Sequence, residues 1–229
     1  TVGICGDAKM VAQQILEKLS KNAGDIGREG RKNLIHQTKS AWLQTLTGLD
    51  HEEDDPGTVW NKEARKRDKD RMSPRQSWRA IQEAIPSDAI ISSDIGNNCA
   101  IGNAYPTFEK GRKYLAPGLF GPCGYGFPSI LGAKIGCPNT PVIGFAGDGA
   151  FGISMNEMSS CARKEWPAIT MVIFRNYQWG AEKRNSILWF DDNFVGTELD
   201  PELSYAKVAD ACGLKGVTVK TMEETTKAI

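Results

Sequence analysis

Apolar residues after position 73 gather in short continuous runs of the length that buried strands take. The runs occupy residues 89–92, 141–146, 169–174 and 217–219. Between them lie stretches with helical spacing, as in the segment that carries Trp78, Ile81 and Ile85, in residues 151–163, and after Thr221, which is placed to cap a final helix. Apolar strands separated by helices are typical of a parallel sheet that helices cover on both faces. We therefore predict an α/β fold with a doubly wound parallel sheet in residues 73–229.

The first 50 residues carry a different pattern. Residues 2–6 predict a short buried strand, and Asp7 is placed to cap a helix whose apolar residues recur at helical spacing. A second helical pattern runs from Leu34 to Leu46. One strand and two helices bury too little surface to form a domain, so we expect residues 1–50 to be part of a larger one. Because the last helical pattern ends where another strand and helix would follow, we expect the chain to be truncated at both ends.

Charge and cysteine content narrow the class of protein. The chain has 28 basic and 28 acidic residues, a balance that argues against a nucleic-acid or membrane partner. Residues 51–72 hold an acidic cluster and a mixed basic run, which we interpret as a charged, solvated linker. No apolar run reaches the length of a membrane span. The six cysteines include no close pair, so we expect a reduced, cytoplasmic setting.

A Gly147-Asp148-Gly149 turn follows directly on the apolar run at 141–146. Parallel sheets bind ligands at the carboxyl ends of their strands. Gly149 lets the backbone approach an anion closely, and the start of the next helix offers free N–H groups to phosphate oxygens. An aspartate beside a phosphate repels it unless a cation lies between them, so this turn predicts a phosphate site that also holds Mg²⁺.

The next apolar run ends in a second polar loop. Asn176 follows residues 169–174. Because the ends of adjacent parallel strands can lie side by side, we expect its amide oxygen to reach the ion held by Asp148. The carbonyl oxygen of Gln178 is a further candidate. Together with two diphosphate oxygens and a water, these groups would complete the octahedral set of oxygens that Mg²⁺ prefers.

These motifs resemble those of the thiamine diphosphate (ThDP)-dependent enzymes. The resemblance rests on the spacing from Asp148 to Asn176, on the Gly96-Asn97-Asn98 loop, and on the glycine-rich loop from Gly121 to Pro128. It implies that residues 73–229 are a diphosphate-binding domain, incomplete at its C-terminus, with ThDP and Mg²⁺ as cofactors. The implied metal ligands are Asp148, Asn176 and Gln178. The implied cofactor-binding residues are Gly96, Asn97, Asn98, Gly121, Pro122, Cys123, Gly147, Asp148, Gly149, Ala150, Asn176, Gln178, Gly180 and Ala181.

Two positions depart from the family pattern. Arg175 stands where most relatives have Asn, although the metal-binding Asn176 remains. Cys123 stands where many relatives have Met, whose bulk holds the cofactor in its bent form. A smaller side chain leaves that role to a neighbour or to backbone contacts. Cys123 is then either a reactive residue or, in the commoner case for this residue type, a packing residue.

Within the family, residues 114–124, 147–157 and 174–183 resemble the sulfoacetaldehyde acetyltransferases, and residues 1–50 resemble the end of their central domain. The resemblance implies that sulfoacetaldehyde and phosphate are converted to acetyl phosphate and sulfite, in taurine and sulfonate breakdown. Lys183 and Arg184 are candidates for binding the anionic substrates, against the alternative that they are solvated surface residues. His36 and His51 lie outside the motifs.

The resemblance also places the glutamate that activates the cofactor in a domain N-terminal to this chain. The 229 residues alone are then inactive, and the site is shared between the subunits of a homodimer or homotetramer. Two alternatives stay open: another ThDP enzyme such as an acetolactate synthase, which shares these ligands, or a non-catalytic ThDP-binding subunit. A different nucleotide-binding module is disfavoured because the sequence lacks GxxxxGK[ST] and a strand-linked GxGxxG.

Overall fold

A computed structural model describes residues 2–21, 27–51, 72–107, 113–163 and 165–229. The chain divides into two compact units, Thr1–Pro56 and Gly57–Ile229. Nearly all of the predicted charged linker at 51–72 lies outside the described residues. The two units are therefore considered one at a time.

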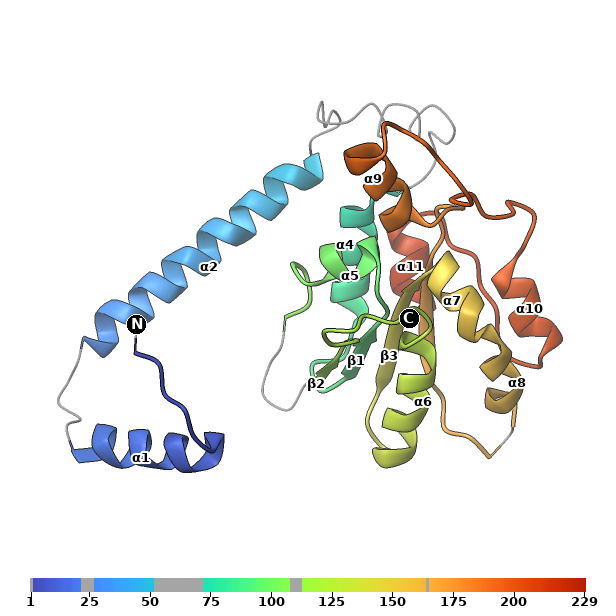
Figure 1. Cartoon of the computed structure of the whole chain (residues 1–229). Helices are drawn as coiled ribbons and strands as arrows, with labels where there is room; N and C mark the ends of the chain where they lie inside the picture. The colour runs from blue at the N-terminus through green and yellow to red at the C-terminus, as the bar shows by residue number, and fades with distance from the viewer. Residues whose placement is uncertain (1, 22–26, 52–71, 108–112, 164) are drawn as a thin grey trace. The chain divides into compact units, whose positions relative to one another are not determined.

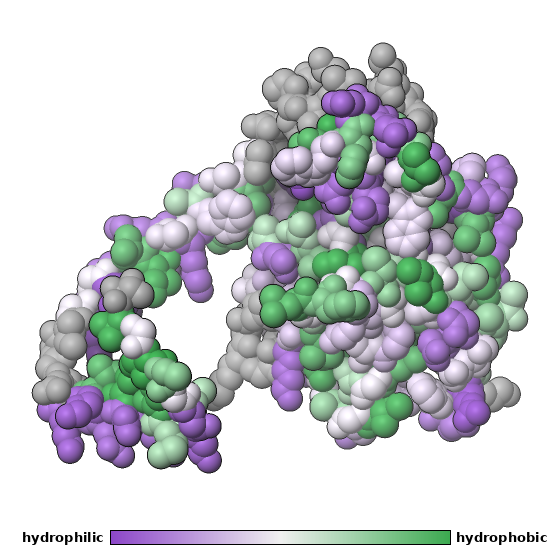
Figure 2. Space-filling model, in the orientation of Figure 1, coloured by the Kyte–Doolittle hydropathy of each residue, from purple (hydrophilic) through white to green (hydrophobic). Residues whose placement is uncertain are grey.

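The first unit contains two helices, α1 (Ala8–Lys21) and α2 (Arg28–His51). Asp7 caps α1 as predicted, since its Oδ1 accepts a hydrogen bond from the Met10 N–H at 3.0 Å. The strand predicted at 2–6 is wrong: these residues form no strand, and Val2 and Ile4 are exposed because no described strand of this unit is there to pair with them. Figure 2 shows apolar side chains on the surface of this unit, which two helices cannot bury by themselves.

The second unit is built on a four-stranded sheet in the order β2-β1-β3-β4. The strands are β1 (Ile90–Ser93), β2 (Lys113–Leu115), β3 (Val142–Gly147) and β4 (Thr170–Phe174), and every pairing is parallel. The register sets Ser93 opposite Phe145 and Gly147 opposite Phe174, so three strands end at one edge of the sheet. The predicted α/β fold with a parallel sheet is confirmed (Figure 1).

Two details of the sheet differ from the prediction. β2 was not predicted, because it has only three residues, one exposed and two half-buried. The strand predicted at 217–219 is wrong: these residues form no strand, no described strand pairs with them, and Val217 is exposed. In both cases pairing with a neighbour, rather than the local pattern, decides whether a strand forms.

Helices cover both faces of the sheet. On one face, Trp78 of α4 (Pro74–Ala84) packs on Phe145 and Phe174, with ring centroids 4.6 and 5.3 Å apart, and α5 (Asn97–Gly102) and α11 (Met222–Ala228) lie with α4. On the other, α6 (Gly126–Gly136) and α7 (Asp148–Ser154) bring Phe127, Ile130 and Phe151 into the main core cluster. This arrangement is the doubly wound one that the sequence predicts (Figure 1).

The described residues of this unit form three further helices: α8 (Met158–Cys161), α9 (Gly180–Trp189) and α10 (Tyr205–Ala211). The helix predicted at 151–163 is instead α7 and α8, which a 3₁₀ turn at Met155–Glu157 separates. Capping boxes begin α4 at Ser73 and α11 at Thr221, the second as predicted.

Candidate cofactor site

Asp148 lies at the end of β3 with only 2% of its surface exposed. Its Oδ2 accepts hydrogen bonds from the N–H groups of Asn176 at 3.1 Å and Tyr177 at 2.7 Å, and its Oδ1 accepts one from Gly149 at 3.1 Å. Burial raises the pKa of this carboxyl, while the three N–H groups oppose the shift. The carboxylate thus ties the end of β3 to the loop after β4, and a nearby cation would favour its ionised form.

The amide of Asn176 faces the same point. One of its terminal atoms lies 3.1 Å from Asp148 Oδ1 and 2.9 Å from the carbonyl oxygen of Gln178. If that atom is the nitrogen, it donates a hydrogen bond to each oxygen. If it is the oxygen, three oxygens converge with no proton between them, an arrangement that needs a cation.

With the Asn176 oxygen turned inward, the three groups would suit Mg²⁺ in kind, and the two distances from that oxygen would suit it in spacing. Neighbouring oxygens of an octahedral Mg²⁺ site, with bonds of 2.0–2.1 Å, are about 2.9 Å apart. Carboxylate, amide and carbonyl oxygens are also the hard ligands that this ion takes. Among the described residues no three His, Cys, Asp or Glu side chains gather as metal ligands, so the mixed set around Asp148 is the one available there.

Several of the other predicted cofactor residues lie close to this point. A methyl group on Gly180, at the start of α9, would come within 2.8 Å of the Asn176 amide and 3.0 Å of the Asn97 amide. A methyl group on Gly147 would lie 3.6 Å from Asn98 Oδ1. The structure therefore brings the loops at the ends of β1, β3 and β4 together, with Gly96 before α5, Ala150 buried in α7 and Ala181 in α9.

The glycine-rich loop before α6 is held by a residue that the sequence analysis missed. Asp94, fully buried after β1, accepts hydrogen bonds from Gly124 at 3.1 Å and Gly126 at 2.7 Å. Gly124 has φ 84, in the left-handed region that glycine adopts without strain. A polar residue directly after a buried strand was the available signal, but its partners lie about thirty residues further along the chain.

Cys123 lies in that loop next to Pro122, and both are exposed. Partial burial of its sulfur raises the pKa of the Cys123 thiol, and the charges of Asp94 and Glu182 raise it further. Only the thiolate is a strong nucleophile, so this environment works against a reactive role for Cys123.

Comparison with protein families agrees with this geometry. Residues 94–229 match the thiamine pyrophosphate enzyme, C-terminal TPP binding domain. The chain belongs to the thiamine pyrophosphate enzymes. Thiamine pyrophosphate is another name for ThDP, and the matched region contains every predicted cofactor residue.

Several relatives in this family are similar over the whole chain. A probable sulfoacetaldehyde acetyltransferase of Rhizobium meliloti is 76% identical, with 100% of this chain and 39% of that protein aligned. A sulfoacetaldehyde acetyltransferase of Roseovarius nubinhibens is 70% identical, with 100% and 38% aligned. The chain therefore spans less than two fifths of the length of these relatives.

A solved structure of the same family has a similar fold. It is a thiamine diphosphate-dependent 4-hydroxybenzoylformate decarboxylase of Rhodococcus jostii RHA1, with a TM-score of 0.63 and 25% identity. The match covers 69% of this chain and 29% of that one.

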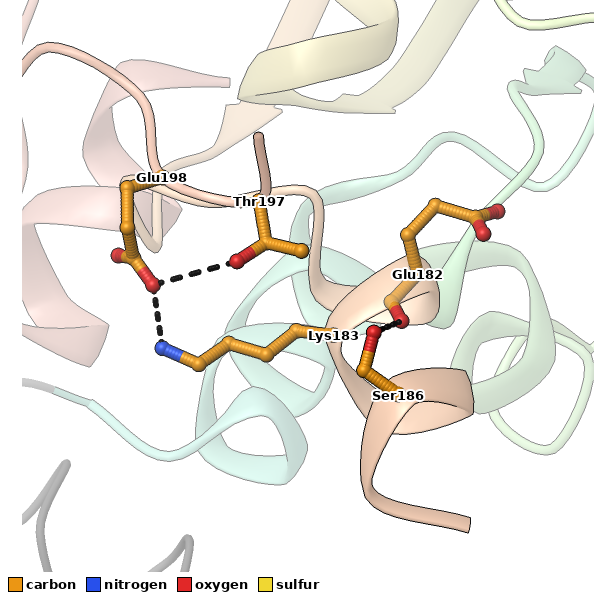
Figure 3. Close-up of polar contacts among 5 residues, drawn as sticks. All are labelled: Glu182, Lys183, Ser186, Thr197 and Glu198. Atoms are coloured by element: carbon orange, nitrogen blue, oxygen red, sulfur yellow. Dashed lines mark hydrogen bonds and ion pairs between the residues drawn. The ribbon is translucent and has the colours of Figure 1, made fainter. Parts of the chain in front are cut away.

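Two basic residues of this thiamine pyrophosphate enzyme already have partners. Lys183, a candidate for substrate binding, forms an ion pair with Glu198, and only 11% of its side chain is exposed (Figure 3). Arg175 donates a hydrogen bond to the carbonyl of Pro201 at 2.8 Å and lies over the ring of Tyr177. Arg184 is exposed. Neither Lys183 nor Arg175 is thus an uncommitted cation for an anionic substrate.

Proposed function

We propose that this chain is the diphosphate- and metal-binding part of a ThDP- and Mg²⁺-dependent acetyltransferase that converts sulfoacetaldehyde and phosphate to acetyl phosphate and sulfite. The observation that supports the cofactor assignment is that the Asn176 side-chain amide lies against both an Asp148 oxygen and the Gln178 carbonyl oxygen, at the ends of β3 and β4. The similarity to proteins named sulfoacetaldehyde acetyltransferase supports the substrate.

In this proposal each group of residues has a separate task. Asp148, Asn176 and the Gln178 carbonyl hold Mg²⁺. The backbone N–H groups of Ala150, Gly180 and Ala181 would face the diphosphate, Gly149 would let the backbone approach it closely while its N–H stays bonded to Asp148, and Gly96, Asn97 and Asn98 would hold the terminal phosphate. Gly121, Pro122 and Cys123 support the rings of the cofactor. ThDP, when bound, supplies the electron sink of the reaction, and the protein supplies position and electrostatics.

The proposed reaction is balanced without an external oxidant. The carbon–sulfur bond of sulfoacetaldehyde breaks and its electron pair leaves with sulfite. The aldehyde carbon loses its hydrogen as a proton, and the electron pair of that C–H bond replaces the pair that leaves with sulfite. The methylene carbon gains a proton and becomes a methyl group, and the former aldehyde carbon, now the acyl carbon, bonds to a phosphate oxygen. A water-poor site favours phosphate over water as the acceptor, since a positioned anion has a high effective concentration.

We further propose that the protein works in the cytoplasm as a homodimer or homotetramer, with each site completed by a second subunit. Leu119 and Phe120, directly before the glycine-rich loop, are almost fully exposed and would be covered by that subunit. The acid that activates the cofactor would come from a domain outside residues 1–229. The six thiols, all unpaired, suit a reducing compartment.

The metal site is tested by Asp148→Ala in the whole protein, with Asp88→Ala, an exposed residue before β1, as the matched control. We expect Asp148→Ala to abolish Mg²⁺-dependent ThDP binding, measured by calorimetric titration with and without Mg²⁺. The control should bind as the unsubstituted protein does. Unchanged Mg²⁺-dependent binding in Asp148→Ala would refute the site.

The reaction is tested by incubating the whole protein with ThDP, Mg²⁺ and sulfoacetaldehyde, with and without phosphate. We expect sulfite release that depends on phosphate and forms acetyl phosphate in equal amount. Conversion of pyruvate to acetolactate, with no sulfite from sulfoacetaldehyde, would instead favour an acetolactate synthase and leave only the cofactor assignment.

A further inference from the structure

We call residues 175–179, between β4 and α9, the metal loop. A short segment after α9, residues 197–201, runs antiparallel to this loop, and we call it the strap. The Trp179 N–H donates to the Thr197 carbonyl at 2.8 Å, and the Leu199 N–H donates to the Tyr177 carbonyl at 2.9 Å. Between these two bonds Gln178 forms a β-bridge with Glu198. The residue whose carbonyl faces the proposed Mg²⁺ site is thus flanked on both sides by backbone bonds to the strap.

Two cationic side chains bind the strap, one near each of its ends. Lys183 of α9 pairs with Glu198, and its ammonium also lies 5.0 Å from the centre of the Phe194 ring. Figure 3 shows Lys183 reaching toward Glu198 while the neighbouring Glu182 points away from the pair. At the other end Arg175 donates to the Pro201 carbonyl and lies 4.5 Å from the centre of the Tyr177 ring.

The metal loop needs such support because its backbone is unusual. Tyr177 has φ 61, in the left-handed region that residues with a side chain rarely adopt. Asp148 holds this turn by accepting hydrogen bonds from the N–H groups of Asn176 and Tyr177. The strap holds the same turn through two other backbone groups, the Tyr177 carbonyl and the Trp179 N–H. Loosening the strap would free the Gln178 carbonyl to turn away.

We propose that Lys183 and Arg175 are positioning residues that act through the strap to hold the metal loop in its Mg²⁺-binding conformation. This inference rests on the proposed function, in which the loop binds Mg²⁺. It assigns a role to Arg175, where the family pattern has Asn, and it replaces substrate binding as the role of Lys183. Neither side chain touches the ion, so each acts on metal affinity and not on the chemistry itself.

The test measures Mg²⁺ affinity in the whole protein at saturating ThDP, followed by tryptophan fluorescence and by activity. The variants are Glu198→Gln, Lys183→Met and the double variant. We expect the half-saturating Mg²⁺ concentration to rise about fivefold in each, since an ion pair with one exposed partner contributes modestly. The double variant should be no weaker than the single ones, because each removes the same interaction. Higher Mg²⁺ concentrations should recover the lost activity.

Lys227→Met with Glu223→Gln is the matched control, since it removes an exposed ion pair of α11. Mg²⁺ affinity should not change in this control. Arg175→Lys tests the other end of the strap, because it keeps the charge but loses the planar group over Tyr177, and it too should weaken Mg²⁺. This milder substitution gives an answer even where Lys183→Met fails to fold.

Two results overturn the inference in distinguishable ways. If the strap variants lose thermal stability or activity with unchanged Mg²⁺ half-saturation, while Asp148→Ala abolishes binding, the strap is merely structural and the proposed function stands. If Asp148→Ala still binds ThDP in a Mg²⁺-dependent way, the metal site itself is wrong and both proposals fall.

Discussion

Asp94 and Asp148 are buried carboxylates at the ends of the neighbouring strands β1 and β3, yet their oxygens meet different partners. Both oxygens of Asp94 accept only from backbone N–H groups, those of Ile95, Gly124 and Gly126. One oxygen of Asp148 is shared with the Asn176 amide. Each carboxylate accepts three backbone hydrogen bonds, so the difference lies at Oδ1 of Asp148, which also faces the side-chain amide of Asn176.

Asp94→Asn tests this difference through the pH dependence of stability. Burial raises the pKa of Asp94 above its ordinary value of 3.8, although its N–H partners lower it. A raised pKa in the folded state means that the contribution to stability is complete below 3.8 and is lost as pH rises through the raised value. The unsubstituted protein should therefore lose part of its advantage over Asp94→Asn as pH rises from acid, measured by thermal midpoints without cofactor.

The opposite trend, with the advantage growing as pH rises, would mean that the folded protein favours the ionised carboxylate and that the N–H groups outweigh burial. At every pH the variant should be the less stable protein, because the Asn NH₂ group must face a backbone N–H in place of an acceptor. One such unmet hydrogen bond costs about 1–3 kcal/mol.

At the same scale, sequence reasoning located one carboxylate and missed the other. Asp148 and Asn176 each follow a clear apolar strand, and the rule that parallel strands end at one edge predicted their proximity. The partners of Asp94 lie in a loop whose path the sequence does not encode locally. The ion pair of Lys183 with Glu198 is missed for a similar reason, since nothing near Lys183 in the sequence separates a candidate substrate-binding residue or a solvated one from a paired one.

At the scale of helices and strands, α7 and the metal loop lie too close for any side chain on Gly149. A methyl group there would come within 2.8 Å of the Trp179 ring. Gly132, within α6, has nothing within 4 Å of the same position. Both positions are glycine, but only the Gly132 position has room for a methyl group.

Gly149→Ala and Gly132→Ala form a matched pair of substitutions. We expect Gly149→Ala to displace Trp179 and weaken ThDP binding about tenfold, which corresponds to a modest overpacking cost. Gly132→Ala should leave binding unchanged and stabilise the protein by about 0.5–1 kcal/mol, since alanine favours a helix interior. Calorimetric titration and thermal melting measure the two effects. Equal ThDP affinity in both variants would contradict the close contact between Gly149 and Trp179.

At the scale of strands, the sequence predicts correctly those that carry a continuous apolar run and pair with a neighbour. β1, β3 and β4 are apolar enough to be identified alone, and their order along the chain already favours a parallel sheet. β2 is a strand because Tyr114 pairs with Ile91. Its own three residues, one exposed and two half-buried, do not predict this pairing. Residues 217–219 have the composition of a strand, but none of the described strands pairs with them. Composition alone therefore gives the wrong prediction there.

At the scale of the whole molecule, the proposed metal and diphosphate ligands all lie in this chain, whereas the family resemblance places the acid that activates the cofactor outside residues 1–229. The chain spans 39% of a relative with which it is 76% identical. Both observations favour a site that other parts of the protein complete.

A protein made only of residues 1–229 should therefore not accelerate proton exchange at C2 of ThDP. The cofactor loses this proton quickly only when an acid protonates its pyrimidine ring, and we place that acid outside these residues. Exchange in D₂O, followed by NMR with Mg²⁺ present, compares this protein with free ThDP. The whole protein is the positive control. Exchange well above the rate of free ThDP would show that residues 1–229 contain their own activating acid.

The two possible orientations of the Asn176 amide have a consequence for how the proposed Mg²⁺ ion would enter and leave. With its nitrogen turned inward, the amide donates to Asp148 Oδ1 and to the Gln178 carbonyl, so both oxygens have a hydrogen-bond partner without an ion. With its oxygen turned inward, the same side chain would be a ligand of the proposed ion. Loading of the proposed site would then require rotation about a single side-chain bond and not rearrangement of the backbone. Because such rotations are fast, capture of Mg²⁺ would be limited by the loss of water from the ion.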